Sequence, residues 1–398
     1  MSSIETTQDE FPLPLEVDYE GTALTYEHPD RPARNTFLAW HRPRKQYVRQ
    51  KQWTNAVLDV MSGRNVDERL KYVGLPGIDL LDIRQLLRTV CEPTSRKLQY
   101  IGFDLAAGSG SGDGTELNIS QSELDARPSV YQPSGVRPDD LRYLSKRTTS
   151  AWHAVKSFGH VDVVNFDLTT TLFDGGPDEP DSYLGALKEV VALQAGNPNP
   201  WVLLVTTRVD RQDMRDSAIR PLLERFRGSI DSCPDLAEAI GLAGLTVPDE
   251  ESAEAWGDDA LRVSSLTATL QWIRGLLNNG SLSAKVRLTS CFVYTSFETA
   301  GVVDIASLVI RVDRKPTNLV DSVFSGPDLV QGDSGQDLGA CSATTADFTR
   351  IAKAVDLDLL LEGDSGLRTE MQDLSADLLA EARYSKHDYR VWVNSSRS

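Results

Sequence analysis

Two aspartates and one glycine-containing turn are the residues whose types and positions suit chemistry on a ligand. Asp104 follows the apolar run Leu98–Phe103, and Asp167 ends the apolar run that begins at Val161. The turn Gly74-Leu75-Pro76-Gly77 follows a third short apolar run. A carboxylate can accept hydrogen bonds from a sugar diol or act as a general base, and glycine lets the backbone approach a ligand closely.

Each of these positions has more than one interpretation. Asp104 could bind both hydroxyls of a ribose, or it could cap the turn that follows it. The two glycines could form only a tight strand-to-helix turn. Asp167 could orient an acceptor or act as a base. Asn118, on the predicted strand Glu116–Ile119, could present its amide to the edge of an adenine ring.

The N-terminal part of the chain carries a run of basic residues. Between Arg31 and Leu58 there are seven lysines and arginines and no aspartate or glutamate. Several lie near i, i+3 and i+7 spacing, which places them on one face of a helix. The residues of interest are Arg42, Arg44, Lys45 and Arg49. They could bind nucleic-acid phosphate or an anionic substrate, or the helix could pair with acidic neighbours. His41, beside them, could act as a base or as a helix cap.

Apolar runs that alternate with helical patterns must position these residues. Such alternation predicts a doubly wound, mostly parallel sheet with helices on both faces, and continuous apolar runs are typical of strands buried on both faces. The predicted strands are Lys71–Gly74, Leu98–Phe103, Glu116–Ile119, Val161–Asp167 and Trp201–Thr206; the predicted helices between them are Leu80–Val90, Asp139–Phe158 and Ser182–Ala195.

The pattern changes after Thr206. Helical stretches at 211–240 and 264–277 are followed by two β-rich runs, Lys285–Thr295 and Ile305–Val312. The connection of about ten residues between these runs is too short for a helical crossover, so the two strands should pair antiparallel. Five parallel strands followed by an antiparallel pair is the element order of the class I methyltransferase sheet.

The predicted organisation therefore has five parts. They are an acidic extended arm at 1–35, a basic helical cover at 36–70, the α/β domain at 71–315, a Gly-, Ser- and Asp-rich linker at 316–345 and a C-terminal helical extension at 346–398.

The composition and the net charge restrict the classes of protein to which the chain can belong. The chain has 398 residues, and 41 Lys and Arg against 58 Asp and Glu give a net charge of −17. No apolar run approaches the roughly 20 residues of a membrane helix, and the polar N-terminus is not a signal peptide. These features predict a cytoplasmic protein without membrane contact. The four cysteines lie far apart without a C-x-x-C pair, and the five histidines lack metal-ligand spacing, so no zinc site, other metal site or disulfide is expected.

From residue 71 to residue 314 the sequence resembles class I S-adenosylmethionine-dependent methyltransferases by strand order. This resemblance implies that S-adenosylmethionine is the cofactor. It would be bound by Gly74, Pro76, Gly77, Asp104 and Asn118, with Asp167 facing the methyl group and its acceptor. Two features depart from the family pattern. The glycines are three residues apart instead of two, and the residue before Gly74 is Val73 instead of an acid.

A second resemblance involves the basic helix. The segments Trp40–Arg49, Tyr72–Gly77 and Leu80–Arg84 are similar to a poorly characterised bacterial family of methyltransferase-like proteins. Such proteins tend to be encoded beside ATPases and other mobile-element or phage-defence components. The resemblance implies a multiprotein complex with protein partners such as an ATPase, in which nucleic acid could contact the basic helix.

Two alternatives stay open. The segment Phe166–Asp174 resembles the first motif of haloacid-dehalogenase-type phosphatases, in which Asp167 would be the nucleophile. Val205-Thr206-Thr207 would then be the second motif, and Asp258 and Asp259 would bind magnesium. Against this, Thr169 replaces the second acid of the first motif, which also falls on the fourth strand. The other alternative is a non-catalytic scaffold subunit.

Overall fold

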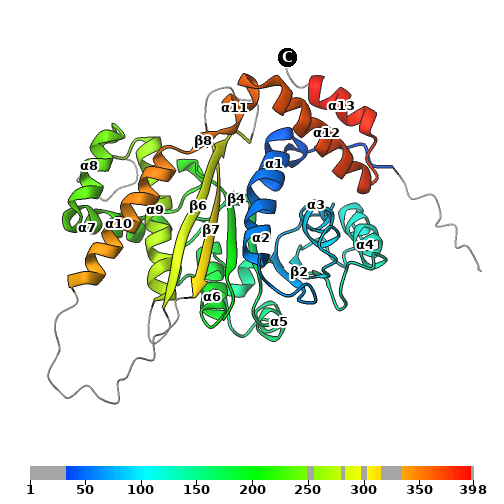
Figure 1. Cartoon of the computed structure of the whole chain (residues 1–398), viewed down its shortest axis with the longest axis horizontal. Helices are drawn as coiled ribbons and strands as arrows, with labels where there is room; N and C mark the ends of the chain where they lie inside the picture. The colour runs from blue at the N-terminus through cyan, green and yellow to red at the C-terminus, as the bar shows by residue number, and fades with distance from the viewer. Residues whose placement is uncertain (1–32, 249–254, 279–282, 297–302, 315–333, 396–398) are drawn as a thin grey trace, which may run out of the picture.

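The computed structural model describes residues 33–248, 255–278, 283–296, 303–314 and 334–395. These residues form one eight-stranded sheet with helices on both faces (Figure 1). Most of the predicted acidic arm, residues 1–32, lies outside the described residues.

The strand order is β3-β2-β1-β4-β5-β7-β6-β8. Strands β1 to β5 run parallel to one another, and β7 pairs antiparallel with both β5 and β6. The predicted doubly wound sheet with an antiparallel strand pair is thus confirmed, as is its class I methyltransferase order. The strands are β1 (Leu70–Gly74), β2 (Leu98–Phe103), β3 (Gly135–Arg137), β4 (Val163–Thr171), β5 (Trp201–Arg208), β6 (Ala284–Tyr294), β7 (Ile305–Arg314) and β8 (Val355–Asp356).

The third strand was predicted in the wrong place. Residues 116–119 lie inside helix α4 (Gly112–Asp125), and the strand at this position in the sheet is β3. The side chain of Ser111 accepts a hydrogen bond from the N–H of Gly114 and caps the start of α4, which is a strong helix-start signal. β3 is a half-buried edge strand of three residues, so it carries no apolar run that could reveal it.

The N-terminal helical cover is nearly continuous. It consists of a 3₁₀ turn, η1 (Ala39–His41), then α1 (Pro43–Tyr47), a π-helical stretch, η2 (Val48–Trp53), and α2 (Thr54–Met61). Pro43 occupies the first turn of α1, where its missing N–H costs nothing.

The remaining helices mostly match the predicted ones, with three differences. The predicted helical stretch 211–240 is divided into a 3₁₀ turn, η5, and two helices, α7 and α8. The predicted helix 139–158 is divided into a 3₁₀ turn, η4, and α5. Helix α10 makes the end of the predicted linker helical, while residues 315–333 lie outside the described part. The bounds are α3 (Leu81–Leu86), η3 (Leu87–Cys91), η4 (Leu141–Ser145), α5 (Ser150–Phe158), α6 (Tyr183–Gln194), η5 (Arg211–Asp213), α7 (Asp216–Ser232), α8 (Pro234–Leu242), α9 (Asp258–Leu277), α10 (Ser334–Ala352), α11 (Leu357–Gly363), α12 (Ser365–Glu381) and α13 (Lys386–Ser395).

The sheet is buried on both faces. Leu203 of β5 packs in a core formed with α5, α6, α7, α9 and α10, whereas its neighbour Leu204 packs in a core formed with α2, α3 and α4. Both leucines are at most 1% exposed. Alternate side chains of a strand point to opposite faces, so an uninterrupted apolar run fills both cores at once.

The two ends of the described chain meet above the sheet. Helices α12 and α13 lie over α1 at the top of the molecule in Figure 1. Phe37 packs against Tyr384 and Trp392, and the N–H of Arg34 donates to the carbonyl oxygen of Arg383 at 3.1 Å. The N-terminal segment and the C-terminal helices therefore form one cover.

The prediction that the cysteines form no disulfide is wrong. Cys233, just before α8, and Cys341, in α10, form a disulfide with their Cα atoms 5.5 Å apart. The two residues are 108 positions apart in the chain, so their spacing gave no sign of the pairing. Cys91 and Cys291 are buried free thiols. Within the described residues, no helix is long and apolar enough to span a membrane.

Candidate functional site

The predicted site residues gather where neighbouring parallel strands end. Strands β2, β1 and β4 are adjacent, and Gly74 is in register with both Gly102 and Asn165. The turn Gly74–Gly77, Asp104 and Asp167 therefore lie along one edge of the sheet, which we call the rim. Open parallel sheets bind their ligands at this edge.

Glycine at position 74 is required by close packing. A Cβ atom built there would lie 2.9 Å from the Cβ of Asn165 and closer still to the Asn165 carbonyl oxygen. Gly77 serves a different purpose, because it has a φ of 64° and open space around the position of a Cβ atom. The first glycine lets β1 approach β4, and the second leaves the backbone accessible.

Asp104 takes one of its two predicted roles, that of a turn cap, while the ribose contact stays a prediction. One carboxylate oxygen accepts a hydrogen bond from the N–H of Ala106 at 2.8 Å, as a turn cap does. No described residue donates to its second oxygen. Burial raises the pKa of Asp104, an effect that the Ala106 hydrogen bond opposes and the nearby Asp113 reinforces. Leu105, which the sequence analysis did not single out, is 62% exposed beside this carboxylate.

The rim turn and the second strand are in direct contact. A Cβ atom at Gly102 would lie 2.7 Å from Cγ of Pro76, so the proline ring rests on the end of β2. Asn118, by contrast, lies on an exposed position of α4 instead of at a strand end. The structural basis for its predicted adenine contact is thus wrong.

Asp167 is paired with a residue of the basic helix. The ammonium group of Lys45 contacts its carboxylate, lies 3.4 Å from Oγ1 of Thr206, and sits 4.4 Å from the ring centroid of Trp53. Lys45 is only 4% exposed. Burial lowers the pKa of Lys45, while Asp167 raises it. The carboxylate predicted as a catalytic base is therefore neutralised by an internal cation.

A second buried ion pair lies next to the first. Nε of Arg49 donates to Oδ1 of Asp82 at 2.9 Å, and the amide of Asn165 donates to the other oxygen of Asp82 at 3.2 Å. The same amide is 3.1 Å from the hydroxyl of Tyr72. Burial raises the pKa of Asp82, and Arg49 lowers it. Asn165 Oδ1 is buried without a hydrogen-bond partner in the described part of the chain.

His41 belongs to a third polar group. Its Nδ1 accepts from the N–H of Leu38 at 3.1 Å, and its Nε2 lies 3.2 Å from Oδ2 of Asp79. Arg34 and the hydroxyl of Tyr384 also contact the buried Asp79. Because both ring nitrogens are engaged, the geometry favours a positioning role for His41 over that of a base.

The other two predicted basic residues point to the C-terminal helices. Arg44 pairs with Asp358 at 2.6 Å and donates to Oγ1 of Thr295 at 3.2 Å. The guanidinium of Arg42 lies 4.8 Å from the ring centroid of Trp392. Together with Lys45 and Arg49, they support the alternative in which the basic helix pairs with neighbouring groups of the same chain.

The acids predicted for a phosphatase each pair with a basic side chain, and the described residues contain no group of three or more His, Cys, Asp or Glu that could hold a metal ion. Asp258 and Asp259 begin α9, where they pair with Arg211 at 2.9 Å and Arg262 at 2.8 Å. Asp167 pairs instead with Lys45.

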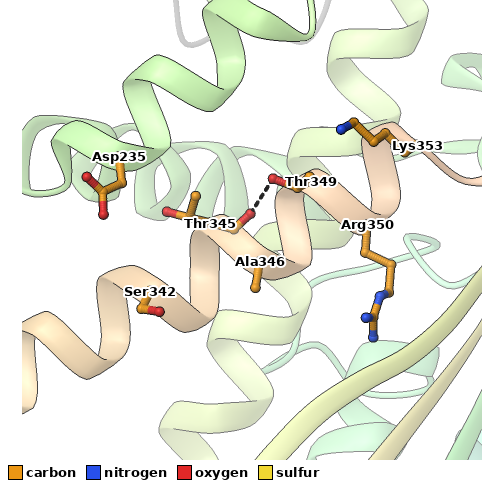
Figure 2. Close-up of a pocket in the computed structure, with 7 residues that line it drawn as sticks. All are labelled: Asp235, Ser342, Thr345, Ala346, Thr349, Arg350 and Lys353. Atoms are coloured by element: carbon orange, nitrogen blue, oxygen red, sulfur yellow. Dashed lines mark hydrogen bonds between the residues drawn. The ribbon is translucent and has the colours of Figure 1, made fainter.

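A cavity of about 530 Å³ lies away from the rim, between α8 and α10 (Figure 2). Asp235 faces it from α8, and hydroxyl-bearing and basic side chains of α10 line the other side. None of the predicted site residues lines this cavity, and its lining has no buried ion pair. We therefore place the candidate functional site at the rim.

Comparison with protein-family models identifies the family of this chain. The model of the PP_RS20740-like family matches residues 34–394, which include the basic helix, the sheet and the C-terminal helices. The chain belongs to the PP_RS20740-like family. No protein with a curated function matches this family member.

Several solved structures are similar at low identity. The 23S rRNA methyltransferase ErmE is 11% identical with a TM-score of 0.29, covering 68% of this chain and 70% of that one. An O-methyltransferase family protein from Burkholderia thailandensis is 14% identical with a TM-score of 0.27, covering 67% and 57%. The plantazolicin methyltransferase BpumL, in complex with SAH, is 10% identical with a TM-score of 0.28, covering 67% and 84%. The fold assignment rests on the strand order, because TM-scores this low carry little weight.

Proposed function

We propose that the chain is a methyltransferase-like protein that binds S-adenosylmethionine, or its product S-adenosylhomocysteine, at the rim. The observation that carries this proposal is Asp104. It is a half-buried carboxylate at the end of a parallel strand, next to the glycine turn of the central strand, and no described residue donates to one of its oxygens. An acid at this position suits the two hydroxyls of a ribose.

Neighbouring groups fit the rest of an adenosyl ligand. The exposed side chain of Leu105 offers an apolar surface beside the carboxylate, on which an adenine ring can pack. The backbone at Gly77 is open to a ligand. S-adenosylmethionine, when bound, would supply an electrophilic methyl group, and this chain would contribute binding and orientation.

Methyl transfer with Asp167 as the base would require a change in the ion pair between Asp167 and Lys45. The ion pair with Lys45 already occupies the carboxylate of Asp167, so this carboxylate is not available to take a proton from a methyl acceptor. Binding of the adenosyl ligand is thus the firmer part of the proposal, and methylation of an acceptor is the part that needs Lys45 to move. An ATPase partner, nucleic-acid contact and a phage-defence role stay predictions.

Calorimetric titration with S-adenosylmethionine and S-adenosylhomocysteine tests the proposal. We expect binding to the native chain, and weakening of about 10- to 100-fold in Asp104→Asn, since a hydrogen bond to a charged group contributes about 1.5–3 kcal/mol. The amide keeps an acceptor for Ala106, so the turn is preserved. The control is Asp388→Asn, which removes an exposed carboxylate on α13. Equal affinities of Asp104→Asn and the native chain would contradict the proposed ribose contact.

A second candidate function is a non-catalytic subunit. The observation that favours it is the pair of buried salt bridges, Lys45 with Asp167 and Arg49 with Asp82, which fill the rim with the chain's own side chains. Absence of binding of either ligand at millimolar concentration would support this candidate over the adenosyl-binding one.

A further inference from the structure

Lys45 is an internal cation held by groups that also bind small organic cations. Its ammonium contacts the carboxylate of Asp167, the hydroxyl of Thr206 and the aromatic face of Trp53. A carboxylate and an aromatic face are the groups by which proteins recognise a cationic ligand. The rim therefore has a cation-binding position, and the chain itself fills it.

This position lies on the strand next to the proposed adenosyl site. Asp167 belongs to β4, which pairs with β1, and Asp104 follows β2 on the other side of β1. An adenosyl ligand with its ribose at Asp104 would have to cross the Gly74 turn to reach β4. Its sulfur end would then lie toward Asp167 and the ammonium of Lys45.

The charge of that sulfur distinguishes two ligands of almost identical shape. S-adenosylmethionine carries a positive sulfonium, whereas S-adenosylhomocysteine carries a neutral thioether. A sulfonium beside Lys45 faces a like charge in a largely buried site, where charges are poorly screened. The thioether does not face this repulsion and leaves the pair with Asp167 intact.

We infer that Lys45 sets the ligand specificity of the rim, making it select the neutral adenosyl thioether over the cationic sulfonium. The inference rests on the proposed function, because it concerns the same adenosyl site.

The test compares the affinities of S-adenosylmethionine and S-adenosylhomocysteine in matched variants by calorimetric titration. The native chain is expected to bind the thioether at least 10-fold more tightly. In Lys45→Met, which leaves Asp167 without its cation, the ratio is expected to move by 10-fold or more toward the sulfonium. Lys51→Met is the control, because Lys51 lies in the same helical segment but pairs with the exposed Glu370 at 2.9 Å.

Two further variants separate charge from folding. Lys45→Arg keeps the positive charge and is expected to keep the preference for the thioether. Lys45→Met/Asp167→Asn removes both charges and avoids a buried unpaired carboxylate; it is expected to bind the two ligands within about threefold of each other. An unchanged affinity ratio in folded Lys45→Met or in the double variant would overturn the inference alone. Absence of binding of both ligands to all variants would overturn the proposed function and the inference with it.

Discussion

His41 and Asp79 show how burial fixes the charge of single residues in this molecule. Burial lowers the pKa of His41, although its hydrogen bond and charge interaction with Asp79 raise it. For Asp79 burial acts in the opposite direction, but the hydrogen bond from His41 and the charges of His41 and Arg34 outweigh it and lower its pKa. Near neutral pH the pair is therefore a neutral imidazole with its proton on Nε2 and an ionised carboxylate.

The free energy of unfolding is expected to fall as pH decreases below about 6.5, the ordinary pKa of histidine. The unfolded chain then takes up a proton that folded His41 does not, at a cost of up to about 1.4 kcal/mol per pH unit. Asp79 does not contribute in this range, because its lowered pKa costs stability only below its ordinary value of 3.8. Urea unfolding at pH 7.5 and pH 5.5 measures the effect.

The matched variant for this measurement is His41→Gln, which cannot titrate. Its stability is expected to depend less on pH than that of the native chain. The comparison is necessary because the pKa of His160 is also lowered, by burial and by the charges of Lys71 and Arg314. Equal pH dependence in the two proteins would show that folding does not lower the pKa of His41.

Sequence alone indicated which residues are charged but not which ones pair. Lys45 and its partner Asp167 are 122 residues apart, so no local spacing connects them. Asp79 and Asp82 were not singled out as site residues. A signal was available, since Asp79 lies just before an apolar helix and Asp82 in its first turn, where a charged side chain among apolar residues requires a buried partner.

Among the elements, the strands whose side chains pack in the hydrophobic cores on both faces of the sheet were predicted correctly. β1, β2, β4 and β5 are buried on both faces and read as continuous apolar runs. The prediction failed at residues 116–119, where Leu117 and Ile119 resemble alternating strand positions although the segment belongs to a capped helix. Two nonpolar residues cannot distinguish a strand from one helical turn, and the distant β3 gave no competing pattern.

Gly74→Ala tests the packing of β1 against β4. The added methyl group would overlap the Asn165 backbone, and relief requires a shift in the paired strands. We expect a loss of roughly 1–3 kcal/mol, the usual cost of overpacking, measured by chemical denaturation. Gly228→Ala in α7 is the control, because its added Cβ meets no atom within 4 Å; it is expected to gain roughly 0.5–1 kcal/mol from helix propensity. A neutral effect at Gly74 would mean that the two strands are not held at this spacing.

At the scale of the whole molecule, the Cys233–Cys341 disulfide connects α10 to the start of α8 across the part of the chain that contains β6 and β7. Closing so long a loop restricts the unfolded chain. We expect Cys341→Ser to lose about 2–4 kcal/mol of stability. Dithiothreitol is expected to lower the melting temperature of the native chain but not that of the variant, which serves as the control. A native chain unaffected by reductant would contradict the pairing.

This disulfide also bears on the predicted cytoplasmic location. Reducing compartments keep most thiols unpaired, so the bond would form there only under oxidising conditions. The location stays a prediction that the redox state of the purified chain can help to test.

The cover shared by both ends of the chain has a consequence for biosynthesis. The helix that carries Lys45 and Arg49 leaves the ribosome before the carboxylates that pair with it, and Asp358 follows its partner Arg44 by 314 residues. Domains tend to fold from the N-terminus as they are made, but this helix lacks its full set of neighbours until α11, α12 and α13 are available. The charges of this helix are thus synthesised long before the last of their partners.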